Sequence, residues 1–221
     1  MSWWTKHKQW LGLSERLPAQ WKNRSWQEIP LLAIDLELTC LDTNVAAITS
    51  IGWIAGTNGT IDLTSAFYQV INTQADLQQS PVIHGLTAED IAKGNELAPA
   101  LQQLSSMLHT HLWVFHHAPL DMPILTREMR NRQIDFSGLL TLDTLSLEKY
   151  IMERAQAVFS RHSFTLPDCR HRYQFPPAPL HNALDDAMAT LELAFAQLNN
   201  LKAMPHPVSD LRHTRSLQYY V

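Results

Sequence analysis

The chain has 221 residues, 45% of them hydrophobic and 17% charged, which is typical of an ordinary globular protein with one main domain. The net charge of -4 argues against a protein that coats nucleic acid by bulk electrostatics, and two cysteines provide no disulfide framework, so a reducing cytoplasmic setting is expected. No stretch is long and apolar enough to span a bilayer, so no membrane partner is expected.

The first residues differ in composition from the rest. Trp3, Trp10 and Trp21 recur at roughly helical spacing with leucines between them, and Pro18 interrupts the pattern. We expect this tryptophan-rich helical extension to pack onto the main domain; a surface for a membrane or a partner protein is the alternative. The expected extension, main domain and tail cover residues 1–28, 29–202 and 203–221.

Three strands are predicted at the start of the main domain. The apolar run Leu31–Leu36 follows Pro30 and is typical of a buried central strand. Ile48–Ala55 and Thr60–Ile71 follow it, and the Asn58-Gly59 pair between them is a strong turn signal. These strands are expected to form an antiparallel meander.

Helices and two further strands are predicted to alternate after the meander. A helical pattern runs with interruptions from Ala88 to Leu108. The later elements are expected at Leu112–Phe115 (strand), about Leu120 to beyond Met129 (helix), Leu140–Leu142 (strand), Leu145–Arg154 (helix) and Ala183–Leu201 (helix). This order predicts an α/β fold with a central mixed five-stranded sheet, three antiparallel strands and then parallel strands, flanked by helices.

Acidic residues lie at the ends of two predicted strands. Asp35 and Glu37 alternate along the first strand, so they project to the same face. Two neighbouring buried carboxylates resist joint ionisation, and a metal ion would remove that conflict; the alternative is that Glu37 is already solvated. Asp121 follows the fourth strand at the sheet's carboxyl end, where open α/β sheets place their sites, although the helix dipole alone also favours an acid there.

The last helix begins with two adjacent acids, of which Asp186 is the better candidate for a metal ligand. Asp186 lies at the edge of the apolar face, whereas Asp185 lies on the polar face, three residues after Asn182, where it suits capping. His181 precedes the helix in a loop stiffened by prolines. An imidazole that titrates near neutrality suits a general base for water; an ordinary surface histidine is the alternative.

Asp35, Glu37, Asp121 and Asp186 together are suited to hold a pair of divalent cations. Ligands that are all oxygen favour Mg²⁺ or Mn²⁺ over zinc. His181 would take a proton from water between these ions.

Three motifs resemble those of the DEDDh family of 3′–5′ exonucleases, which includes the proofreading epsilon subunit of bacterial DNA polymerase III, ribonuclease T and oligoribonuclease. The family's Asp-x-Glu-Thr-Thr-Gly is similar to Asp35-Leu36-Glu37-Leu38-Thr39-Cys40, and its His-Asn-Ala-x-Phe-Asp to the segment from His116 through Asp121. Its His-x-Ala-x-x-Asp-Ala matches His181 through Ala187. The resemblance covers roughly Leu31 to Leu201 and implies a ribonuclease H-like exonuclease fold.

The resemblance assigns the four acids to two metals and His181 to water activation. It places Leu38 and Thr39 beside the terminal nucleotide, and the loop with His84 beside its base. Cys40 replaces a glycine, Leu38 the usual threonine and His117 the usual asparagine, which makes His117 a further candidate for substrate binding.

The expected function is therefore metal-dependent hydrolysis at the 3′ end of single-stranded nucleic acid, with DNA favoured, to release nucleoside 5′-monophosphates. An exoribonuclease that trims RNA is one alternative. A non-catalytic nucleic-acid-binding or interaction protein that keeps the fold is another. A polymerase or other protein that binds the N-terminal extension is the expected protein partner.

Overall fold

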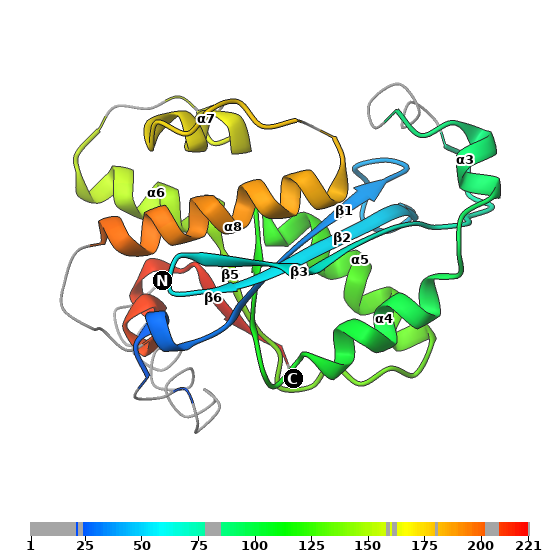
Figure 1. Cartoon of the computed structure of the whole chain (residues 1–221), viewed down its shortest axis with the longest axis horizontal. Helices are drawn as coiled ribbons and strands as arrows, with labels where there is room; N and C mark the ends of the chain where they lie inside the picture. Colours follow the sequence, from blue (N-terminus) through cyan, green and yellow to red (C-terminus); the bar gives the residue numbers. More distant parts are fainter. Residues whose placement is uncertain are drawn as a thin grey trace.

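The computed structural model describes residues 21, 24–77, 85–157, 160, 163–179, 181–201 and 208–220. One mixed sheet runs through it, in the strand order β3-β2-β1-β4-β5-β6 (Figure 1). The strands are β1 (Leu31–Leu38), β2 (Ile48–Thr57), β3 (Thr60–Val70), β4 (Leu112–Phe115), β5 (Leu140–Asp143) and β6 (Leu217–Tyr219). β1 pairs antiparallel with β2 and parallel with β4, so it is an interior strand of the sheet.

The predicted mixed α/β sheet of antiparallel and then parallel strands is confirmed. It has six strands, so the predicted count of five is wrong. The sixth strand, Leu217–Tyr219, pairs antiparallel with β5 from within the predicted tail. Three residues are too short for an alternating pattern to stand out in the sequence, which explains the omission. The predicted division into extension, domain and tail stays a prediction.

Side chains of β1 alternate between two hydrophobic clusters, one on each face of the sheet. Leu32, Ile34 and Leu36 pack in the cluster that contains residues of α4 and α5, whereas Leu31 and Ala33 pack in the cluster that contains residues of α6 and α8. Both faces are therefore covered, and this is why β1 is an almost continuous apolar run rather than an alternating one.

The helices form the outer layers, with α4 and α5 on one side of the sheet and α6, α7 and α8 on the other (Figure 1). The α-helices are α3 (Ala88–Ala92), α4 (Leu97–Ser106), α5 (Ala118–Asn131), α6 (Thr144–Arg154), α7 (Leu166–Arg172) and α8 (Ala183–Asn200). Two short 3-10 helices are η1 (Trp26–Glu28) and η2 (Val208–Thr214).

Two details of the helices differ from the sequence interpretation. The interrupted pattern from Ala88 to Leu108 is two separate helices, α3 and α4. α7 was not predicted, although Thr165 caps it by accepting a hydrogen bond from the Asp168 amide. It is seven residues long, too short for a clear apolar stripe.

The predicted N-terminal helical pattern lies mostly outside the described residues. Trp21 is buried and belongs to the cluster on the α8 side of the sheet. Within the described ranges, no helix combines the length and the apolar character that crossing a bilayer requires.

Candidate active site

Two of the predicted acids lie in the C-terminal half of β1. Asp35 and Glu37 continue the row of Leu31 and Ala33, which faces α8, and the alternation predicted from the sequence is thus present in the structure. Asp35 pairs with Gly52 of β2, and Glu37 pairs with Ser50. Glu37 is 6% exposed, so the alternative that it is simply solvated is excluded.

The first turn of α8 brings the third acid to these two. Asn182 caps the helix, and its side-chain oxygen accepts the amide hydrogens of Leu184 and Asp185. Asp186 then faces β1, and its Oδ2 accepts a hydrogen bond of 3.0 Å from the backbone N–H of His181. Asp186, rather than Asp185, joins the acids of β1, as the helical pattern predicted.

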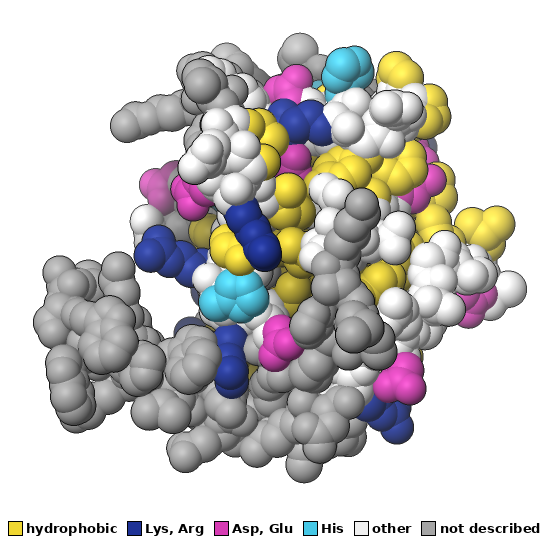
Figure 2. Space-filling view, turned by 90° about the vertical axis from the view of Figure 1, so that its left-hand side faces the viewer, with side chains coloured by type: hydrophobic (Ala, Val, Ile, Leu, Met, Phe, Trp, Pro, Cys, Tyr) yellow, Lys and Arg dark blue, Asp and Glu magenta, His cyan; other side chains and the backbone are white. Residues whose placement is uncertain are grey.

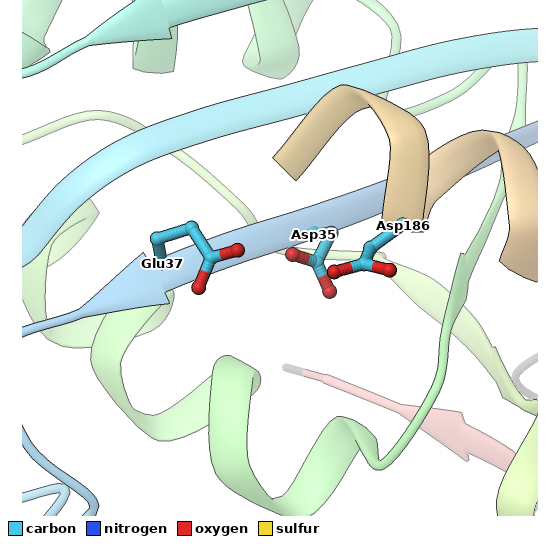
Figure 3. Close-up of side chains that lie close together, drawn as sticks. All are labelled: Asp35, Glu37 and Asp186. Carbon is cyan, nitrogen blue, oxygen red and sulfur yellow. The ribbon is translucent and has the colours of Figure 1, made fainter. Parts of the chain in front are cut away.

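The carboxylates of Asp35, Glu37 and Asp186 form one compact group. Each offers an oxygen that lies within 4.8 Å of an oxygen of the other two. Figure 3 shows Asp35 and Glu37 on β1 and Asp186 on α8, with their carboxylates directed into a shared space. The Oδ1 atom of Asp186 is buried and has no hydrogen-bond partner among the residues that the structure describes.

Burial and the charges of neighbouring acids favour the protonated forms of Asp35 and Asp186. Burial of the Asp35 carboxylate raises its pKa well above the usual value, and the charges of Asp121, Glu37 and Asp186 raise it further. Burial also raises the pKa of Asp186 to about 6, with a further rise from Glu37, although the hydrogen bond from the His181 amide acts in the opposite direction.

Asp121, the fourth predicted acid, lies on α5 and is not among the three carboxylates whose oxygens lie within 4.8 Å of one another. It is 4% exposed and lies in the first turns of the helix. Burial raises the pKa of Asp121 well above its usual value, and the charges of Asp143 and Glu37 raise it further. The charge of Asp121 in turn contributes to the raised pKa of Asp35.

A buried acid that the sequence reasoning passed over, Asp143, holds the turn that precedes α5. Its Oδ1 accepts hydrogen bonds from the backbone N–H groups of His117 (2.8 Å) and Ala118 (3.2 Å). Its Oδ2 accepts the amide and the hydroxyl of Ser146 at the start of α6. An acid directly after a buried strand and before a helix is the sequence signal that could have identified it.

The chemistry of this group fits divalent cations. Carboxylate oxygens are the ligands that Mg²⁺ and Mn²⁺ prefer. The unpartnered Oδ1 of Asp186 and the unfavourable proximity of several carboxylates are both explained if cations lie between them.

The candidate base, His181, is exposed and lies directly beside Asp186. Its backbone has a positive φ of 67°, which directs its N–H toward the Asp186 carboxylate. The role of its imidazole stays a prediction.

The predicted substrate-binding residues have different surroundings. Leu38 is 6% exposed and packs in the core, and the Thr39 hydroxyl accepts the Ala47 amide, closing the loop after β1. His117 is exposed and has a left-handed backbone at the start of α5. His84 lies outside the described residues. Substrate binding by these four residues stays a prediction.

Three cavities lie apart from the acids. They have volumes of about 290, 250 and 480 Å³. The last is lined by residues of η1, the β2–β3 turn and α8, at the end of the molecule where that turn lies, on the left in Figure 1. Figure 2 views that end, where hydrophobic side chains are visible among polar and charged ones.

Comparison with known proteins gives a match to the family model described as "Exonuclease" over residues 32–194. The chain is 28% identical over 179 residues to the PolC-type DNA polymerase III of Mycoplasmopsis pulmonis, with 76% of the chain and 12% of the relative covered. It is 27% identical over 177 residues to the 3′–5′ exonuclease DinG of Staphylococcus haemolyticus, with 78% of the chain and 18% of the relative covered. The chain thus spans less than a fifth of the length of either relative.

Two of the solved structures that share its fold illustrate the likeness. One is Escherichia coli exonuclease I in complex with a dA16 oligonucleotide, with a TM-score of 0.63, 14% identity, and coverage of 79% of this chain and 41% of that one. The other is the nuclease domain of 3′hExo, a DEDDh family member bound to rAMP. Its TM-score is 0.62 at 13% identity, and the match covers 77% of this chain and 92% of that one. At such identities the likeness extends to the fold alone.

Proposed function

The chain belongs to the exonuclease family, and we propose that it is a metal-dependent exonuclease that removes nucleotides from the 3′ end of nucleic acid. The observation that carries this proposal is the group of carboxylate oxygens from Asp35, Glu37 and Asp186, all within 4.8 Å of one another. The resemblance to DEDDh exonucleases and the ribonuclease H-like fold, both expected from the motifs, are confirmed by the family match and the structural neighbours.

Asp35, Glu37, Asp121 and Asp186 would hold two Mg²⁺ or Mn²⁺ ions. Bound there, such ions supply charge neutralisation at the scissile phosphate and lower the pKa of water. The acids are already oriented by the register of β1 and by the cap of α8, so binding needs little rearrangement of the backbone. The raised pKa values of Asp35, Asp121 and Asp186 reflect burial and a mutual repulsion that cations would relieve.

His181 would act as the general base in this proposal. The neighbouring Asp186 holds the backbone of His181 through its amide, while the imidazole belongs to an exposed residue at the start of α8. From this position it would accept the proton of the attacking water and release it to solvent. Attack on the terminal phosphodiester would then release a nucleoside 5′-monophosphate.

The proposed substrate is a single strand with a free 3′ end, with DNA favoured. Support comes from the dA16 oligonucleotide bound to exonuclease I and from the polymerase name of one relative. RNA is the second candidate, because the similar nuclease domain of 3′hExo is bound to rAMP. A protein that binds the predicted extension, residues 1–28, is the proposed macromolecular partner, with a polymerase as the first candidate.

The test is degradation of 3′-blocked and 3′-free single-stranded DNA, duplex DNA and short RNA, all labelled at the 5′ end. We expect stepwise shortening of the free single-stranded DNA with Mg²⁺ or Mn²⁺, none with EDTA, and nucleoside 5′-monophosphates as products. Faster cleavage of RNA than of DNA would make RNA the preferred substrate. No metal-dependent cleavage of any of these substrates by the folded protein would reject the proposed activity.

A further inference from the structure

The first turn of α8 approaches the sheet closely at Gly52. Gly52 lies on β2, directly opposite Asp35 in the register of β1. A Cβ atom at this position would lie 2.4 Å from the carbonyl carbon of Ala183 and 2.4 Å from the nitrogen of Leu184. Both atoms belong to the backbone of the first turn of α8.

The clash of an added Cβ atom could not be relieved by rotating a side chain, because the atoms that it would meet belong to the backbone. Ordinary contacts of a Cβ atom begin near 3.4 Å, so a methyl group here requires a displacement of about 1 Å between the helix and the strand. The absence of a side chain at position 52 therefore sets how closely the first turn of α8 approaches β2.

The same turn carries one of the acids. The Asp186 amide donates to the carbonyl of Asn182, and the Asn182 side chain caps the turn, so Asp186 moves with this turn as a unit. Metal sites tolerate only about 0.2 Å of deviation in the distance from ligand to metal. A displacement of about 1 Å between α8 and the strands would therefore separate Asp186 from Asp35 beyond that tolerance.

We propose that Gly52 is a positioning residue for the metal centre: its missing side chain seats the start of α8 against the sheet and so places Asp186 beside Asp35. This inference rests on the proposed function, because it concerns how the ligands of the proposed cations are arranged. Gly52 touches neither metal nor substrate and acts only through the position of Asp186.

The experiment compares Gly52→Ala with Gly94→Ala in the full chain. Gly94 is a matched control, because its Cβ would also meet backbone, 2.7 Å from the Asn72 nitrogen, but in the segment between α3 and α4. Titration calorimetry measures the affinity for Mn²⁺, and steady-state kinetics measures kcat and KM on a labelled single strand. We expect Gly52→Ala to bind Mn²⁺ at least about tenfold more weakly and to lose about 100-fold in kcat, with little change in KM. Gly94→Ala should keep wild-type Mn²⁺ affinity and kcat.

A second variant, Asn182→Ala, keeps the inference testable if Gly52→Ala does not fold. It removes the cap that holds the first turn without adding any atom, and a severalfold loss of Mn²⁺ affinity is expected. Wild-type Mn²⁺ affinity in a folded Gly52→Ala, or in Asn182→Ala, would overturn the inference. A wild-type protein that neither binds Mn²⁺ nor cleaves any strand would instead reject the proposed function itself.

Discussion

At the scale of single residues, the site is a group of carboxylates in surroundings that disfavour their charge. Asp35, Asp121 and Asp186 all have raised pKa values, with burial as the largest cause. Protonation and cation binding are two ways to remove the same repulsion, so they are expected to compete. The affinity of this site for metal should therefore rise with pH, as the acids lose their protons.

The first prediction concerns the stability of the protein without metal. Asp186 has a pKa of about 6 when folded, against 3.8 for an ordinary aspartate, so the folded protein binds this proton more tightly than the unfolded chain. Its stabilising contribution is present below about pH 4 and is lost as the pH rises through about 6. At about 1.4 kcal/mol per pKa unit, the loss is at most about 3 kcal/mol.

Asp186→Asn mimics the protonated acid at every pH and serves as the reference. The Tm of the wild type without metal should fall relative to this variant between pH 4 and 7, measured by differential scanning fluorimetry in EDTA. Saturating Mg²⁺ should raise the wild-type Tm more at pH 7.5 than at pH 5. A difference in Tm that does not change with pH would contradict the raised pKa of Asp186.

The second prediction separates the two adjacent acids of α8. Asp186→Ala removes a carboxylate of the acidic group and should lower kcat by about 10³-fold, because charge stabilisation of several kcal/mol is lost. Asp185→Ala should change kcat by less than about tenfold, since Asp185 lies outside that group. Circular dichroism confirms that both variants are folded. The opposite order of activities would show that the wrong acid has been assigned.

At the scale of elements, short connections hold the acids in place. The turn between β4 and α5 has a left-handed residue, His117, and Asp143 accepts the amides of that residue and the next. On the other face, Glu148 of α6 binds Arg172 (2.7 Å), Tyr173 (2.9 Å) and Gln197 (2.8 Å), which joins α6, α7 and α8. One buried acid thus holds the turn before α5, and another joins the three helices on the other face to one another.

The third prediction tests the turn before α5. In Asp143→Asn, one side of the amide can still accept the His117 and Ala118 amides, but its NH₂ would then face the Ser146 amide. We expect a loss of about 1 to 3 kcal/mol in the free energy of unfolding and of about tenfold or more in kcat, because Asp121 follows this turn.

Asp135→Asn is the matched control. Asp135 accepts the amide and hydroxyl of Ser137 in a similar way, but it is on the surface and remote from the acids. Urea unfolding and steady-state kinetics should show changes within about 0.5 kcal/mol and unchanged kcat for this variant. If Asp143→Asn behaves like Asp135→Asn, Asp143 does not hold the turn.

At the scale of the whole molecule, the last described residues complete the sheet. β6 pairs with β5, and the Ser216 carbonyl just before it accepts the amide of Asp143 (2.8 Å). Leu217 is buried in the cluster on the α8 side. The C-terminal segment therefore contributes both to the core and to the residue that holds the turn before α5.

The fourth prediction concerns this segment. Leu217→Ala should lower the free energy of unfolding by about 2 to 4 kcal/mol, because it removes a buried side chain from the core. Gln218→Ala, on the exposed side of the same strand, should change it by less than about 0.5 kcal/mol. Urea titration followed by fluorescence measures both. Equal and small effects would mean that β6 is dispensable and that the predicted boundary at residue 202 holds.

Sequence alone was sufficient for the order of the first five strands and the longer helices, for the alternation that places Asp35 and Glu37 on one face of β1, and for the choice of Asp186 over Asp185. These features follow from local periodicity, which needs no knowledge of distant contacts. The sequence was also sufficient for the resemblance to DEDDh exonucleases, because that resemblance rests on motifs with fixed spacing.

Tertiary structure alone decided the rest. The contact of Gly52 with α8, the hydrogen bonds of Asp143 to the turn before α5 and the pairing of Leu217–Tyr219 with β5 all join residues far apart in the chain. The periodic pattern of apolar residues cannot predict such contacts, because each depends on how closely separate elements approach after they have packed. The pKa shifts of the acids depend on the same approach, since burial and mutual repulsion exist only once β1, α5 and α8 have converged.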